Sequence, residues 1–354
     1  MPTDYCFPFR LESIEVLKHA ETLNPADARA PYYLGNLLYD HQPENAIKEL
    51  EKSRSLDSSF PIVNRNLGQA YARNENDLPK AIASLERAVA CKPDDPRLYL
   101  ELDQMYEAGG VPAEKRLALL EKNQATIAQY DDPLAREIVL LVQLGHYDKA
   151  IELLKGHHFH VWEGGGMIHE VYVNAHLLRG EDHLSAKRHG EALKDFEAAL
   201  EYPENLEVGR PARDARALEI YYLVGAAQEA LGHTSRAKQF YEKSVAELYG
   251  RSEIGYYQGL ALRKLGRDGE ATELFDGLVS HGKERLAASP GLDFFAKFGE
   301  RQSERSRLAE AHYLTGLGHL GKGQKEEAKV EFEQTLTLNP NHAWVKMQMA
   351  ELRR

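Results

Sequence analysis

One spacing constrains the fold of this chain more than any other feature: an alanine followed four residues later by a large apolar residue. Residues four apart lie on the same face of an α-helix, so each pair indicates a helix with a small and a bulky side chain on one side. Seven such pairs recur along the chain: Ala46 and Leu50, Ala81 and Leu85, Ala150 and Leu154, Ala192 and Phe196, Ala237 and Tyr241, Ala271 and Phe275, and Ala328 and Phe332. The sequence therefore predicts a repeated helical unit.

Glycine and proline mark the limits of this unit. In three copies a glycine stands twelve residues before the alanine, at Gly225, Gly259 and Gly316. Pro93 and Pro340 follow their alanine by twelve residues, and a proline there ends the helix because it lacks a backbone donor. Small residues let two helix backbones approach, and the bulky residue fills the space between neighbours. Each unit is thus predicted to be a helix, a short turn and a second helix.

The period and the residues within it resemble those of a known family. Gly225 and Gly259 lie 34 residues apart, which is the period of the tetratricopeptide (TPR) repeat. The most complete copy has Tyr313, Gly316, Ala328, Phe332 and Pro340 in place. The resemblance implies an all-α fold, a right-handed TPR solenoid of about eight helix pairs. We expect irregular insertions and a C-terminal capping helix over residues 343–352.

We predict three parts along the chain. Residues 1–155 hold N-terminal repeats, the first of them a half-repeat that indicates a larger architecture upstream. Residues 156–211 hold an irregular histidine and tryptophan loop with an extended repeat. Residues 212–354 hold C-terminal repeats, an insertion at residues 280–305 and the capping helix. Insertions in a solenoid usually map to one face, where function tends to be added.

Composition excludes several classes of partner and site. The formal charge of −11 argues against nucleic acid, because a phosphate backbone would be repelled on average. The longest apolar stretches fall far short of a bilayer span, so no membrane partner is expected. Two cysteines are too few for a disulfide framework, which favours a reducing, cytoplasmic location. Phosphate-loop and nucleophile-elbow motifs are missing from the sequence, so we expect no catalysis on this chain alone.

A narrower resemblance spans most of the chain. It is carried by residues 32–39, 65–68, 159–165, 202–206 and 293–296, including a Phe-His-x-Trp-Glu-Gly-Gly segment. These segments are similar to the C-terminal TPR region of large bacterial proteins with an uncharacterised β-rich N-terminal domain. The resemblance implies an association with carbohydrate processing. Val161 and Gly166 depart from the family pattern, in which proline and glutamate are expected.

The first helix of each repeat should supply an inner binding groove. Reading the repeat offsets around the glycine position predicts groove residues on the first three complete repeats: Asn36, Tyr39, Arg65, Asn66, Gln69 and Gln104. Tyrosine, amide and guanidinium groups are typical of a binding surface rather than of a core. A clamp for a C-terminal carboxylate is rejected because Glu101 would face its own ligand.

The irregular loop is the second candidate site. Its residues His158, His160, Trp162 and Glu163 are not required by repeat packing. A tryptophan face beside a carboxylate can hold a sugar ring by stacking and hydrogen bonding. Alternatively, Trp162 fills a gap in an irregular repeat while Glu163 caps the following helix. Both interpretations remain open.

Histidines beyond the loop continue this candidate site. His169 and His176 lie two turns apart, with Tyr172 between them, and all three project from one helical face. We favour a polar stripe that faces a groove over a metal site, because histidines two turns apart on one helix cannot share an ion. Accordingly, we expect neither a metal nor a cofactor.

Together these features predict a non-catalytic scaffold for a protein or peptide partner. That partner could be a β-rich domain of the same polypeptide. The alternative is an accessory region of a carbohydrate-active protein, with Trp162 and Glu163 contributing to a sugar site.

Overall fold

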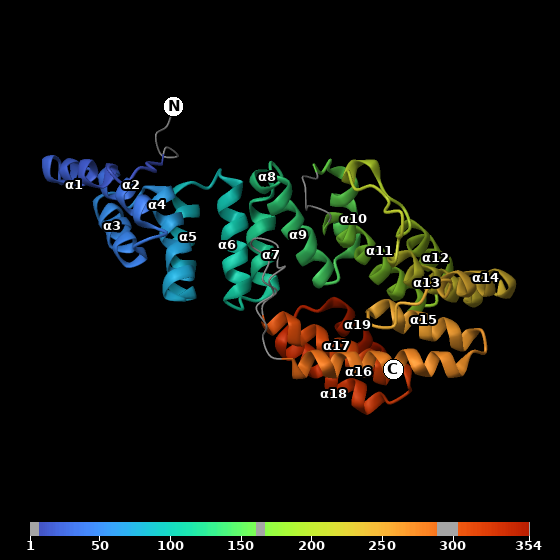
Figure 1. The fold of residues 1–354 in the computed structure, drawn as a ribbon. Coiled ribbons are helices and arrows are strands. Elements are labelled where there is room, and N and C mark those ends of the chain that lie inside the picture. Colours follow the sequence, from blue (N-terminus) through green and yellow to red (C-terminus); the bar gives the residue numbers. More distant parts are fainter. Residues whose placement is uncertain (1–6, 161–166, 289–303, 354) are drawn as a thin grey trace. The chain divides into compact units, whose positions relative to one another are not determined.

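The computed structural model describes residues 7–160, 167–288 and 304–353 (Figure 1). All regular secondary structure in these ranges is helical, which confirms the predicted all-α class. The chain divides into two compact units, Met1–Leu140 and Leu141–Arg354. The three-part division suggested by the sequence stays a prediction.

Helices of the first unit follow one another in antiparallel pairs. They are α1 (Ser13–Leu23), α2 (Arg29–Leu38), α3 (Pro43–Leu56), α4 (Pro61–Ala70), the π-helical turn η2 (Tyr71–Glu75), α5 (Leu78–Cys91), α6 (Pro96–Ala108), α7 (Ala113–Lys122), α8 (Gln124–Ile127) and α9 (Asp131–Gln143), whose last residues belong to the second unit.

The second unit continues the same pattern. Its helices are α10 (Tyr147–Gly156), α11 (Met167–Ser185), α12 (His189–Ala198), the 3₁₀ turn η3 (Glu204–Leu206), α13 (Arg216–Ala230), α14 (Thr234–Ser244), α15 (Glu253–Lys264), α16 (Asp268–Ala287), α17 (Glu304–Gly321), α18 (Lys325–Leu338) and α19 (Ala343–Leu352). In chain order, the described helices give eight helix pairs between α1 and α19, as predicted.

Close approach within each pair explains the glycine spacing. A Cβ atom added at Gly259 would lie 2.4 Å from the Phe275 ring, and one added at Gly316 would lie 2.5 Å from the Phe332 ring. Gly180 is in the same relation to Phe196, at 2.4 Å. Real Cβ atoms do not come this close, so the aromatic ring of the second helix occupies the space that glycine leaves on the first.

A turn that is longer than the repeat requires has a local cause. Between α4 and α5 the sequence holds one residue more than the repeat requires, and the structure absorbs it in η2. Asn76 then adopts a left-handed backbone with φ 53°, a conformation that asparagine tolerates. The Asp77 side chain accepts a hydrogen bond from the Lys80 backbone at 3.0 Å and so caps α5.

Two irregular segments of the second unit are joined by hydrogen bonds. The extended residues after α10 meet η3 where the Phe159 backbone N–H donates to the Asn205 carbonyl at 2.8 Å. The Asn205 side chain donates back to the carbonyls of Leu154 and His157, at 2.8 and 2.7 Å. Both segments are therefore held in a fixed register.

Part of the predicted insertion lies outside the described residues, including the aromatic residues Phe294, Phe295 and Phe298 and the matched segment at 293–296. The helices on either side of it, α16 and α17, are long, with 20 and 18 residues. Among the helices that the structure describes, none combines the length and the apolarity needed to cross a bilayer.

Candidate functional site

A chain of polar side chains crosses three successive first helices of the first unit. The Asn66 amide on α4 donates to Asn36 Oδ1 on α2 at 2.7 Å, and Arg65 Nη1 donates to Asn66 Oδ1 at 3.3 Å. Arg65 then pairs with Glu101 on α6, with Nε 2.9 and 2.8 Å from the two carboxylate oxygens. Gln69 also donates to Glu101, at 3.3 Å. The sequence predicted four of these five residues as groove residues.

This Arg65–Glu101 pair is accessible from solvent. The side chain of Arg65 is 37% exposed and that of Glu101 14% exposed. A partly exposed ion pair contributes at most about 1 kcal/mol to stability. Its main effect is therefore to fix the positions of both side chains. Through Arg65 it also fixes Asn66 and Asn36.

Tyr39 lies at one end of this network. The Arg73 guanidinium lies 5.7 Å from the centre of its ring and pairs with Asp40 at 3.3 Å. Burial raises the pKa of the Tyr39 hydroxyl, and the nearby Arg73 charge opposes that effect. Tyr39 is thus a neutral, half-buried aromatic group. We call Asn36, Tyr39, Arg65, Asn66, Gln69 and Glu101 together the first-helix surface.

Gln104, also predicted in the groove, is exposed on α6 and takes no part in these hydrogen bonds. Its neighbour Asp103 instead forms a buried ion-pair cluster that sequence reasoning missed. Asp103 accepts from Arg116 at 2.8 and 2.9 Å and from Arg136 at 2.6 Å, and Glu107 bridges the same two arginines. Asp103 is fully buried and Arg116 is 2% exposed, so this cluster ties α6, α7 and α9 together.

The predicted histidine stripe on α11 does not face a groove. His169, Tyr172 and His176 are buried, and they point at the segment from α12 to Tyr202. His169 stacks on Tyr202 with ring centres 3.9 Å apart, and the Tyr172 hydroxyl donates to the Ala198 carbonyl at 3.0 Å. The stripe prediction was wrong because α11 presents this face to its own partner helix.

His176 shows the same inward orientation most clearly. Its Nδ1 lies 2.8 Å from Asp195 Oδ1, and Arg179 also pairs with that carboxylate. Burial is the largest effect on His176 and lowers the pKa of its imidazole, while Asp195 acts in the opposite sense. His176 is a packed structural residue in this arrangement.

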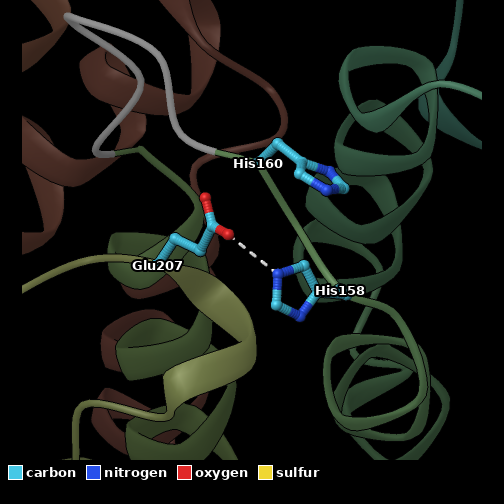
Figure 2. A group of neighbouring side chains, drawn as sticks. All are labelled: His158, His160 and Glu207. Atoms are coloured by element: carbon cyan, nitrogen blue, oxygen red, sulfur yellow. Dashed lines mark hydrogen bonds and ion pairs between the residues drawn. The ribbon is translucent and has the colours of Figure 1, made fainter.

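The loop histidines, unlike those of α11, are exposed. His158 and His160 are exposed, and they lie beside Glu207, which follows η3 (Figure 2). His158 Nε2 is 2.8 Å from Glu207 Oε1, and the two imidazole ring centres are 5.1 Å apart. Trp162 and Glu163, predicted in the same site, lie outside the described residues. The structure therefore brings two of the loop residues together with a glutamate that the sequence did not single out.

In the second unit, the C-terminal helix lies against first helices. Trp344 on α19 donates to Asn174 on α11 at 3.2 Å, and its ring packs edge-on to Tyr257 on α15. Arg216 on α13 donates to the same Asn174 oxygen at 3.0 Å. Val345 is fully buried. The predicted capping helix thus forms, and it also covers part of the first-helix side of this unit.

Comparison with known proteins identifies the repeats. Family models of the tetratricopeptide repeat match residues 36–96, 218–246 and 309–342. The chain therefore contains TPR repeats in both units, and its fold is that of a TPR solenoid. The models describe the repeat and do not identify a narrower family.

Solved structures resemble the chain only loosely. A TPR protein from Parabacteroides merdae is 14% identical, covering 84% of this chain and 100% of its own at a TM-score of 0.45. YrrB, described as a TPR protein with an unusual peptide-binding site, is 16% identical, covering 72% and 99% at 0.35. The human IFIT1 dimer with PPP-AAAA is 16% identical, covering 92% and 77% at 0.33. TM-scores this low support no conclusion about function.

Proposed function

We propose that the chain is a binding scaffold and that the first-helix surface of the first unit binds an extended segment of a peptide or protein. TPR proteins are generally scaffolds of this kind. The observation that carries the proposal is the chain of hydrogen bonds from Asn36 through Asn66 and Arg65 to Glu101. Repeat packing alone does not require these polar groups, because small and apolar residues perform the packing.

The network offers a specific position for a backbone carbonyl. Asn36 Nδ2 is buried and makes no hydrogen bond, while Asn36 Oδ1 is occupied by Asn66. Buried polar atoms are nearly always paired, and an unpaired one costs about 1–3 kcal/mol. A peptide carbonyl removes this penalty if the Asn36 side chain turns its amide towards the surface on binding, because the nitrogen is buried in the unbound chain.

Charge decides which part of a peptide fits. Arg65 and Glu101 neutralise each other across α4 and α6, so the centre of the surface carries little net charge. A terminal carboxylate would lie near Glu101 and compete with it for Arg65. The surface therefore suits the neutral backbone of an internal segment, with Tyr39 as an aromatic contact at one end and exposed Gln104 at the other.

The remaining predicted residues contribute less to the proposal. His169, Tyr172 and His176 are buried, so they are not proposed to contact a ligand. The alternative of a sugar site depends on Trp162 and Glu163, outside the described residues, and it stays a prediction from sequence. The same holds for a β-rich domain as the partner.

A selection followed by variant binding tests this function. A phage-displayed library of random peptides is selected on the full chain, and the enriched peptides are synthesised and titrated by fluorescence anisotropy. Asn66→Ala removes the Asn66 hydrogen bonds to Asn36 and Arg65. Asn36 and Arg65 are then no longer fixed in the unbound chain, so ordering them on binding should lower affinity about tenfold, equivalent to about 1.4 kcal/mol. Gln69→Ala should give a smaller loss.

The control is Arg87→Ala, which removes an exposed arginine from the second helix α5 without touching the network. Its affinity should equal that of the unsubstituted chain. Thermal unfolding of each variant confirms that the fold is retained. Enriched peptides that bind the Asn66 and Arg87 variants equally well would refute the proposed surface.

A further inference from the structure

We propose that His158, His160 and Glu207 form a binding site for a divalent transition-metal ion of the zinc type. This proposal is independent of the peptide surface, because His158, His160 and Glu207 belong to the second unit and the first-helix surface belongs to the first. It departs from the sequence-based expectation that no metal is bound, because the third group, Glu207, lies 49 residues away from His158 along the chain.

The ligand atoms are close enough to share one ion. One nitrogen from each imidazole and one Glu207 oxygen all lie within 4.8 Å of one another. Around a tetrahedral zinc ion with bonds of about 2.0–2.1 Å, ligand atoms are separated by about 3.3 Å. His158 and Glu207 at 2.8 Å would therefore open slightly and His160 would approach, which side-chain rotations can supply.

Neighbouring buried residues and backbone hydrogen bonds position the three ligand residues. His158 and His160 flank Phe159, which is buried, and alternation along an extended segment puts both histidines on the side opposite Phe159. Glu207 directly follows Leu206, which is also buried. The hydrogen bonds made by Phe159 and Asn205 join the two segments. A site with fixed supports binds an ion at a lower ordering cost.

The backbone of Glu207, at the end of η3, sets the direction of its side chain. Its φ is 51° and its ψ 20°, in the left-handed region that glycine and asparagine adopt more easily than glutamate does. This conformation aims the carboxylate at the histidines (Figure 2).

The donor set indicates which ion would bind. Two imidazole nitrogens and one carboxylate oxygen suit zinc, cobalt, nickel or copper, whereas calcium and magnesium prefer oxygen ligands throughout. The side chains of His158 and Glu207 are 57% and 40% exposed. Three protein ligands at an exposed site leave a coordination position for water or for a group from a bound partner.

Isothermal titration of the full chain, without a histidine tag, with zinc chloride tests the site. We expect one ion per chain, with release by chelator. His160→Ala should weaken binding at least tenfold, and His41→Ala, which removes an exposed histidine from the first unit, should leave it unchanged. Cobalt in place of zinc should give a visible absorption spectrum of low coordination number that His160→Ala abolishes.

Glu207→Asn separates a metal role from a structural one. Asparagine fits the left-handed backbone better, so the metal-free variant should unfold at a higher temperature than the unsubstituted chain, yet it should lose zinc. Absence of zinc binding by the unsubstituted chain would overturn the proposal. The proposal would also be overturned if the His160→Ala or Glu207→Asn variant bound zinc as tightly as the unsubstituted chain does.

Discussion

A buried acid in the second unit gives a prediction whose size can be worked out. Glu181 on α11 is 9% exposed. Burial, with Glu351 of α19 and Asp182 adding like charge, raises the pKa of its carboxyl from 4.5 to about 8. The folded chain therefore keeps a proton on Glu181 at neutral pH, whereas the unfolded chain releases it.

The sign of the effect on stability follows from this difference. The contribution of Glu181 to stability is fully present below pH 4.5 and is lost as pH rises towards 8. At 1.36 kcal/mol for each pH unit, the loss amounts to about 3 kcal/mol at pH 7. Glu181→Gln carries no proton to lose, so it should be more stable than the unsubstituted chain by up to about 3 kcal/mol at pH 7 and equally stable near pH 4.5.

Urea unfolding at a series of pH values measures this difference. Tryptophan fluorescence is a suitable signal because Trp344 lies on α19, the helix that carries Glu351. Glu273→Gln on α16 removes an exposed carboxylate and serves as the matched control, with no change in pH dependence expected. Parallel pH profiles for Glu181→Gln and the unsubstituted chain would refute the reasoning.

Two further substitutions test the packing. Gly259→Ala puts a methyl group where the Phe275 ring lies 2.4 Å away, so the melting temperature should fall with a loss of about 1–3 kcal/mol. Ala at exposed Gly269, which has open space around it, is the control. Asp103→Asn leaves Glu107 as the remaining carboxylate beside the buried Arg116 and should cost about 1–3 kcal/mol in chemical unfolding. Unchanged stability in either variant would contradict the packing described.

Much of the fold could be predicted from local spacing. The positions of Gly259 and Phe275, or Gly316 and Phe332, are sixteen residues apart and meet within one helix pair, so a single repeat contains its own packing rule. Because each repeat contacts mainly its neighbours, the rule carries over to the next pair. The number of helix pairs followed directly from it.

The candidate site was predictable only in part. Asn36 and Gln69 each follow a repeat glycine by one residue on successive first helices, and Arg65 and Asn66 lie within about one turn of Gln69 on α4, so repeat register brings the four together. On α11, periodicity grouped His169 and His176 on one face. It could not tell whether that face packs against the partner helix or lines a groove. Histidine serves in cores as well as on surfaces, and here Asp195 and the Glu201 carbonyl supply buried partners.

The pairing of His158 with Glu207 was beyond local reasoning. These residues belong to irregular segments, where no helical or strand period relates sequence position to space. Their meeting depends on Asn205, whose side chain bonds to the carbonyls that end α10. Only a long-range contact of this kind shows that the loop histidines have an acidic neighbour.

The most direct test of the account is amide hydrogen exchange on the full chain with and without a selected peptide. The account predicts new protection in the first helices α2, α4 and α6, with little change in the second helices α3 and α5. Protection confined to the second unit, or to the outer helices of the first, would contradict it.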